Sequence, residues 1–165
     1  MTAAALLGVE PNLSSTEVAA ILRANSDDTG TPGPDPETGA GVMNLNRIFS
    51  RNESGIHDLA LADFHLSPEA REGNGPLQVV VQNRGTEPVR DVRVEVFFDG
   101  DSHQIEIGDL EVNEVGVAKI DFAAERLMVP GGVEIVARTF APRVEDNRPE
   151  NNVRGARIGL APTEE

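Results

Sequence analysis

Six side chains that carry carboxylate or amide oxygens lie within eight residues near the C-terminal end of the chain: Glu145, Asp146, Asn147, Glu150, Asn151 and Asn152. Oxygen atoms of this kind are the ligands that Ca²⁺ prefers in proteins. The turn is therefore a candidate calcium site, although it lacks the ordered spacing of an EF-hand loop. The alternative is that these side chains bind backbone amides at the entrance to the last strand. No other metal and no cofactor is predicted.

Other reactive residue types give weaker signals. The three histidines are His57, His65 and His103, too far apart in sequence to form a zinc motif. Cysteine is absent, which excludes disulfides, thiolate metal sites and cysteine nucleophiles. The serines Ser14, Ser15 and Ser26 occupy cap and loop positions, and Asp99 with Asp101 fits an ordinary hairpin tip. The sequence therefore predicts no catalytic residue.

Composition narrows the range of partners. The 165 residues carry a net charge of −14, which argues against nucleic acid and anionic membrane surfaces. No apolar run approaches the roughly 18 residues that a membrane span needs. Aromatic residues are 4%, with no Trp or Tyr, so the core must consist mainly of aliphatic side chains. Thirteen of the fourteen basic residues are arginine, a ratio from which no function is inferred.

The elements that would position the acidic turn are strands. Residues 92–98 alternate apolar and polar side chains with a period of two, and the same pattern recurs in the segments around 77–81, 105–110, 118–122 and 133–137. Further strands are predicted at 56–66 and 156–160. Asp99-Gly100 and Pro130-Gly131-Gly132 mark turns. These seven strands, at the spacing of an immunoglobulin-like sandwich, predict a mainly β fold over residues 56–160.

The first fifty residues have a different pattern. Residues 2–7 predict a helix ended by Gly8, and Ser14 with Glu17 forms a capping box at the start of a second helix that runs to about Asn25. A turn-rich loop follows over 26–41, then a brief strand and a short helix around 47–49. Polar residues 51–55 predict a linker, and 161–165 a disordered tail.

Two segments of the β region resemble the CARDB family, immunoglobulin-like domains attached to secreted bacterial and archaeal proteins. The first is Val79-Val80-Val81-Gln82-Asn83-Arg84-Gly85, and the second is Glu145-Asp-Asn-Arg-Pro-Glu-Asn-Asn-Val-Arg-Gly-Ala-Arg-Ile-Gly-Leu160. The Asp58-Leu59 pair is a third point of resemblance, because domains of that family typically open with Asp-Leu. The resemblance implies an accessory or adhesive module outside the cell. A signal peptide is expected outside the 165 residues.

The first third is similar to the C-terminal end of subtilisin-like serine peptidase domains. The similarity lies in Ala-Ala-Leu-Leu, Pro-Asn-Leu-Ser-Ser-Thr-Glu-Val, Ile-Leu-Arg-Ala-Asn-Ser-Asp-Asp and Gly-Ala-Gly-Val-Met-Asn, within residues 2–48. In that family a central helix begins at the nucleophilic Ser of a Gly-Thr-Ser motif, and this sequence matches neither that motif nor the catalytic Asp and His. No triad residue is therefore assigned here, and the chain by itself is not expected to be an enzyme.

Together the resemblances imply a non-catalytic portion of a secreted subtilisin-like serine peptidase. Residues 1–50 would close the peptidase domain, and residues 56–160 would act in adhesion, substrate targeting or stabilisation. The expected partners are a protein, cell-surface or matrix ligand, or the catalytic domain. Two alternatives stay open: a free-standing extracellular interaction module, and a processed fragment that completes a separate catalytic chain.

Overall fold

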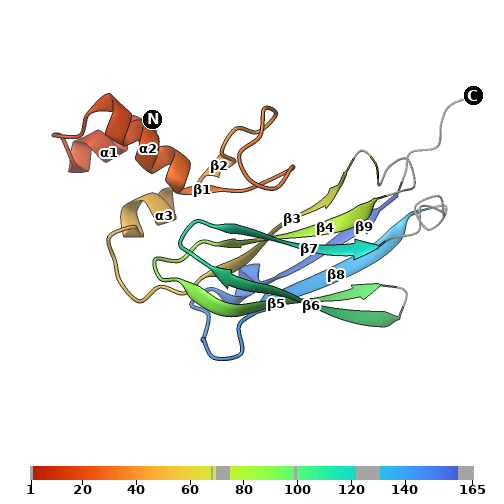
Figure 1. The fold of residues 1–165 in the computed structure, drawn as a ribbon. Coiled ribbons are helices and arrows are strands. Elements are labelled where there is room, and N and C mark those ends of the chain that lie inside the picture. The colour runs from red at the N-terminus through yellow and green to blue at the C-terminus, as the bar shows by residue number, and fades with distance from the viewer. Residues whose placement is uncertain (1, 68, 70–74, 99, 122–130, 160–165) are drawn as a thin grey trace, which may run out of the picture.

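In the computed structural model, a β-sandwich carries a small helical segment at one end (Figure 1). The structure describes every residue except 1, 68, 70–74, 99, 122–130 and 160–165. One sheet has the strand order β3-β4-β7 and the other β6-β5-β8-β9, and all neighbouring strands are antiparallel. The predicted seven-stranded sandwich is confirmed, with a two-stranded pair, β1-β2, outside it. The described residues include no helix long and apolar enough to cross a membrane.

The sandwich strands follow the predicted segments closely. They are β3 Leu59–Leu66, β4 Pro76–Asn83, β5 Val89–Phe98, β6 Asp101–Leu110, β7 Val115–Asp121, β8 Val133–Phe140 and β9 Val153–Ile158. Alternate side chains of β4, β5 and β8 form one aliphatic core between the sheets. Predicted positions Asp99, Phe122, Pro130, Leu160 and the tail 161–165 lie outside the described residues.

A β-bulge in β3 changes which side chains face the core. Leu61 pairs with Val81, but Asp63 pairs with Val80, so Ala62 is an extra residue on this strand. Because one extra residue reverses the alternation, Leu59 and Leu61 face the core before the bulge and Phe64 and Leu66 after it. Asp63 is therefore turned to the outer face of its sheet.

Two predicted strand boundaries were wrong. Residues 56–58 do not belong to β3, because the Ile56 carbonyl accepts hydrogen bonds from Thr86 and Glu87 in a neighbouring turn, 2.8 and 3.2 Å. The last strand begins at Val153, three residues before the predicted start, where it pairs with Arg138 of β8. Both errors arise because strand ends depend on partners that a local pattern does not contain.

The helical segment has the predicted order of three helices with a strand before the last, but β1 lies within the predicted loop 26–41. It comprises α1 Thr2–Val9, α2 Ser15–Ala24, β1 Ser26–Asp27, β2 Val42–Met43 and α3 Leu45–Ser50, while η1 Pro149–Asn151 precedes β9. The capping box is present: the Glu17 amide donates to Ser14 Oγ at 3.3 Å, and the Ser14 amide donates to the Glu17 carboxylate at 2.8 Å. The predicted end of the first helix at Gly8 was wrong. Helix α1 continues to Val9, and the amide of the next residue, Glu10, still donates to the Leu6 carbonyl at 2.8 Å.

The chain has two separate hydrophobic cores. The larger lies between the two sheets, and the smaller consists of Leu6, Val18 and Ile48, one from each helix. No side chain belongs to both clusters among the residues that the structure describes. The helical segment and the sandwich must therefore be joined by other contacts.

Candidate functional site

The acidic turn predicted to bind calcium holds the start of β3 in place. The Leu59 amide donates to Asp146 Oδ2 at 2.7 Å, and the His57 amide donates to Asn147 Oδ1 at 2.8 Å. In return the Asn147 amide donates to the His57 carbonyl at 2.8 Å. These hydrogen bonds fit the second interpretation of the turn, in which its side chains bind backbone amides.

Several oxygens of this region still have no partner. Asn151 Nδ2 donates to Asp58 Oδ1 at 2.8 Å, while buried Asp58 Oδ2, Asn151 Oδ1 and Asn152 Oδ1 accept no hydrogen bond from the described residues. The nearest cation to Asp58 Oδ2 is Arg148, at 3.4 Å. Burial raises the pKa of Asp58, and the bond from Asn151 opposes this.

Calcium at this turn stays a prediction. The described residues contain no group of three His, Cys, Asp or Glu side chains placed to hold a metal ion, but Ca²⁺ also takes amide and carbonyl oxygens. A calcium titration should raise the melting temperature if the turn binds the ion, because a ligand specific for the native state stabilises it. Mg²⁺ at equal concentration is the control, and a melting temperature that calcium leaves unchanged would remove the site.

The remaining predicted positions show no reactive geometry. Ser15 is the first residue of α2, and Ser26 Oγ donates to the Leu22 carbonyl at 2.8 Å. The His103 ring stacks on Phe98 with 5.0 Å between centroids, and Asp101 is exposed at the start of β6. These roles are structural.

The strongest polar cluster in the described residues joins the helical segment to the sandwich. Its centre is Arg47 of α3, whose side chain is only 2% exposed. Nη1 donates to the Ser26 carbonyl at 2.6 Å and to Asp27 Oδ1 at 3.0 Å, and Nη2 donates to Asn113 Oδ1 in the turn between β6 and β7. One buried guanidinium therefore connects three separate parts of the chain.

The end of β4 completes this junction. Gln82 donates through Nε2 to the Ser26 carbonyl at 3.1 Å and accepts from the Asp28 amide at 3.0 Å. Arg84 donates to Gln82 Oε1 at 3.0 Å and pairs with Asp27 Oδ2 at 3.3 Å. Both Gln82 contacts are buried, so the two bodies are held by polar groups that water does not reach.

A second polar contact fixes the loop between β1 and β2. Asp63, turned outward by the bulge in β3, accepts hydrogen bonds from Gly30 N at 3.0 Å and Thr29 Oγ1 at 3.3 Å. The bulge thus supplies the acceptor that holds this loop against the outer face of the β3-β4-β7 sheet.

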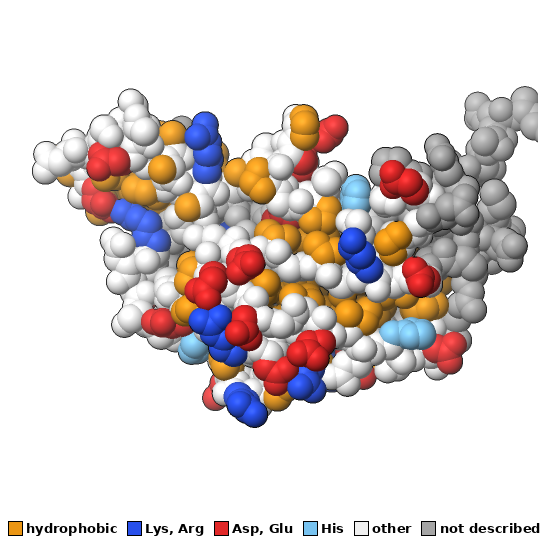
Figure 2. All heavy atoms as spheres, in the orientation of Figure 1, with side chains coloured by type: hydrophobic (Ala, Val, Ile, Leu, Met, Phe, Trp, Pro, Cys, Tyr) orange, Lys and Arg blue, Asp and Glu red, His pale blue; other side chains and the backbone are white. Residues whose placement is uncertain are grey.

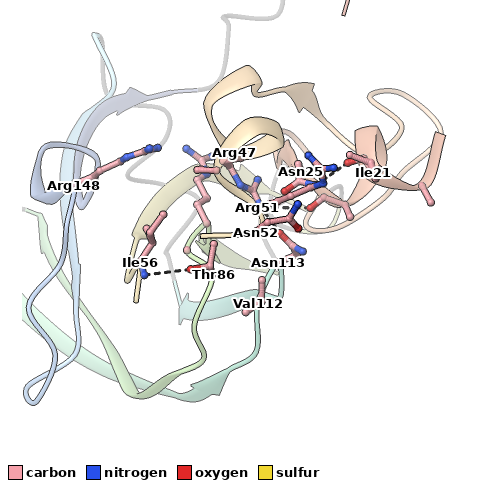
Figure 3. A pocket seen from close by; sticks show the side chains of 15 residues that line it. Ile21, Asn25, Arg47, Arg51, Asn52, Ile56, Thr86, Val112, Asn113 and Arg148 are labelled. Carbon is pink, nitrogen blue, oxygen red and sulfur yellow. Dashed lines mark hydrogen bonds between the residues drawn. The ribbon is translucent and has the colours of Figure 1, made fainter. Parts of the chain in front are cut away.

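A pocket of about 360 Å³ opens at this junction (Figure 3). Four arginines from three parts of the chain line it: Arg47 and Arg51 from α3 and its C-terminal end, Arg84 after β4, and Arg148 before η1. None of its fifteen lining residues is Asp or Glu. Arg148 reaches toward the pocket from the loop before η1, opposite the helical segment that carries Arg47 and Arg51. The arrangement could bind an anion.

Sequence reasoning missed this pocket. Its arginines are separated by up to 101 positions, from Arg47 to Arg148, and form no local basic run, so only the fold brings them together. The arginine excess noted above is the one available signal, and it does not say which residues meet.

Comparison with known proteins supports the fold. No protein-family model and no curated protein matches the chain. The chain is similar to solved structures, among them an NMR structure of a domain named as part of a cell surface protein from Methanosarcina acetivorans. That match has a TM-score of 0.50 and 16% identity, and covers 66% of this chain and 95% of the other. At this identity the likeness concerns the fold alone.

Proposed function

We propose that this chain is the non-catalytic portion of a secreted subtilisin-like serine peptidase, in which the sandwich is an accessory module and the helical segment contacts the catalytic domain. The observation that carries the proposal is an uncovered apolar surface. Of nine large hydrophobic side chains that are exposed among the described residues, six belong to the helical segment: Leu7, Val9, Val42, Met43, Leu45 and Phe49. Hydrophobic side chains also gather on this segment in Figure 2.

An uncovered apolar surface of this kind is unusual for so small a body. α1 is apolar over nearly all its length, yet only Leu6 of its eight residues is buried. Contiguous exposed apolar groups on a protein surface mark contact with a partner. The order of α1, α2, the following loop and the segment 39–44 agrees with the order that the resemblance to the end of a subtilisin-like domain implies. A peptidase catalytic domain is therefore the partner that we propose.

The sandwich supports an extracellular role. A domain of a named cell surface protein has a similar fold, and the strands of this chain carry no predicted catalytic residue. We propose that the sandwich holds the enzyme near a protein or matrix ligand, or stabilises it.

A free-standing extracellular interaction module is the second candidate. It is favoured by the buried polar junction, which attaches the helical segment to the sandwich without another chain. The adjoining coding sequence separates the two. The peptidase proposal expects an in-frame Gly-Thr-Ser-x-Ala-Ala-Pro motif there, whereas no peptidase motif would favour the free-standing module.

The apolar surface gives a direct test. Because Val42 and Phe49 are exposed, V42S/F49S should change the free energy of unfolding of this chain by no more than about 0.5 kcal/mol and should reduce binding of a hydrophobic dye. Joined to its catalytic domain, the same variant should lose peptide hydrolysis.

The matched control is Ile48, the fully buried neighbour of Phe49 in α3. I48S should destabilise the isolated chain by about 2 kcal/mol or more, because it removes core contacts and buries a hydroxyl. Equal losses in V42S/F49S and I48S, or full hydrolysis by the joined V42S/F49S variant, would contradict the proposed contact.

A further inference from the structure

The junction pocket collects positive charge in a strongly acidic chain. Asp27 lies between Arg47 and Arg84, at 3.0 and 3.3 Å, and Asp58 lies 3.4 Å from Arg148. Three guanidinium groups thus share two carboxylates, so these ion pairs together carry one excess positive charge. The net charge of the whole chain is −14, so this local excess opposes the general trend.

Two further charged groups lie near the pocket without forming an ion pair with its three central arginines. Arg51 pairs with Glu10, so that pair is neutral. The Asp28 carboxylate accepts the Gly33 amide at 3.1 Å, lines the adjoining hollow instead of this pocket, and has its pKa raised by burial.

The arginines also influence one another. Burial is the main cause that lowers the pKa of Arg47, and the charge of Arg148 lowers it further, while Asp27 raises it. Burial is also the main cause that lowers the pKa of Arg84; Asp27 raises it, Arg47 lowers it, and the more distant Asp58 and Asp28 raise it. Like charges held this closely favour the binding of an anion between them.

Two of the arginines retain donors that a ligand could use. Arg47 Nε is buried and has no hydrogen-bond partner in the described part of the chain. The Arg148 guanidinium has the 3.4 Å ion pair with Asp58 and no hydrogen bond to any described side chain. An arginine with free donors binds a carboxylate through two parallel hydrogen bonds.

Beside the arginines, the pocket wall has polar side chains, among them Asn25, Asn52 and Thr86, and also a group of apolar ones. Carbon groups contributed by α2, the segment before β3 and the turn after β6 face the arginines: Ala20, Ile21, Ala24, Ile56 and Val112. A ligand that places an anionic group at the arginines and an apolar group against these carbon groups matches both parts of the wall. The volume of about 360 Å³ is within the usual range for small ligands.

We propose that the junction pocket binds a carboxylate attached to an apolar group, as at the C-terminal residue of a peptide. One residual positive charge matches one carboxylate, whereas a phosphate dianion would exceed it. The proposal stands on the pocket itself and does not depend on whether the chain serves a peptidase. A failure to bind the peptide would therefore leave the proposed peptidase contact untouched, and the reverse also holds.

Calorimetric titration of the whole chain with N-acetyl-Ala-Leu tests the proposal. The free acid should bind, and the matching C-terminal amide should bind at least tenfold more weakly. R148Q should weaken binding of the acid at least tenfold, because it removes the guanidinium with free donors. R90Q is the control, since Arg90 pairs with Asp109 on an exposed strand.

A second variant, V112D, tests the pocket while the ion pair between Arg148 and Asp58 stays in place. V112D places a negative charge on the pocket wall and should abolish binding, whereas V153D makes the same change at an exposed position of β9 and should not. Equal binding of acid and amide would overturn the proposal, as would unchanged binding in both R148Q and V112D. Tighter binding of inorganic phosphate than of the peptide acid would overturn the assignment to a carboxylate.

Discussion

Replacing Arg47 by methionine is expected to lower the free energy of unfolding by about 3–5 kcal/mol, the cost of removing one partner from a buried ion pair. Methionine keeps much of the volume of the side chain but donates no hydrogen bond. The substitution would leave Asp27 without its shortest cation contact and Asn113 Oδ1 without a donor, and the Ser26 carbonyl would keep only the bond from Gln82. Urea unfolding followed by circular dichroism measures the loss.

The matched control for this variant is R90M. Arg90 also pairs with carboxylates, those of Asp109 and Glu111, but its side chain is 57% exposed. A pair exposed to water contributes about 1 kcal/mol or less, so R90M should be nearly neutral. Similar small losses in R47M and R90M would show that the junction does not hold the two bodies together.

Replacing Gly41 by alanine is expected to cost about 3 kcal/mol or more, among the large effects of single substitutions. Gly41 has a φ of +94°, and an added Cβ would lie 2.1 Å from the backbone oxygen of Asp27. Two strains therefore add: an unfavourable backbone conformation, and a clash with backbone that cannot rotate away. The clash falls on β1, next to the carboxylate that pairs with Arg47.

Gly39 separates these two contributions. It also has a positive φ, +68°, but an added Cβ there meets nothing within 4 Å. G39A should thus show only the conformational cost, about 1–2 kcal/mol. Thermal unfolding of both variants gives the comparison, and a G41A variant no less stable than G39A would contradict the predicted clash.

Local patterns predicted the sandwich well, because strand alternation and caps are short-range properties. Val92, Val94 and Val96 occupy the core as their spacing predicts, and the capping box at Ser14 is present. The bulge at Ala62 was missed, since its signal is a single reversal of alternation within β3. Leu59, Leu61, Phe64 and Leu66 can all face the core only if the strand contains a bulge, so assigning them to one face would have predicted it.

The candidate sites were less predictable. The acidic turn was singled out as a candidate calcium site, which stays a prediction, and its Asp146 and Asn147 hydrogen bonds are of the kind expected for a structural turn. The arginine pocket could not be predicted, because Arg47, Arg84 and Arg148 meet only once two sheets and three helices are in place. Long-range proximity of this kind has no counterpart in residue spacing.

The two separate cores also bear on how such chains can be recombined. Since the aliphatic clusters share no member, exchanging the sandwich for another of its class would leave the packing around Leu6, Val18 and Ile48 intact. A graft would need to reproduce chiefly the seam residues Gln82, Arg84 and Asn113. A joint built from so few side chains lets evolution, or a protein engineer, swap one half without redesigning the other.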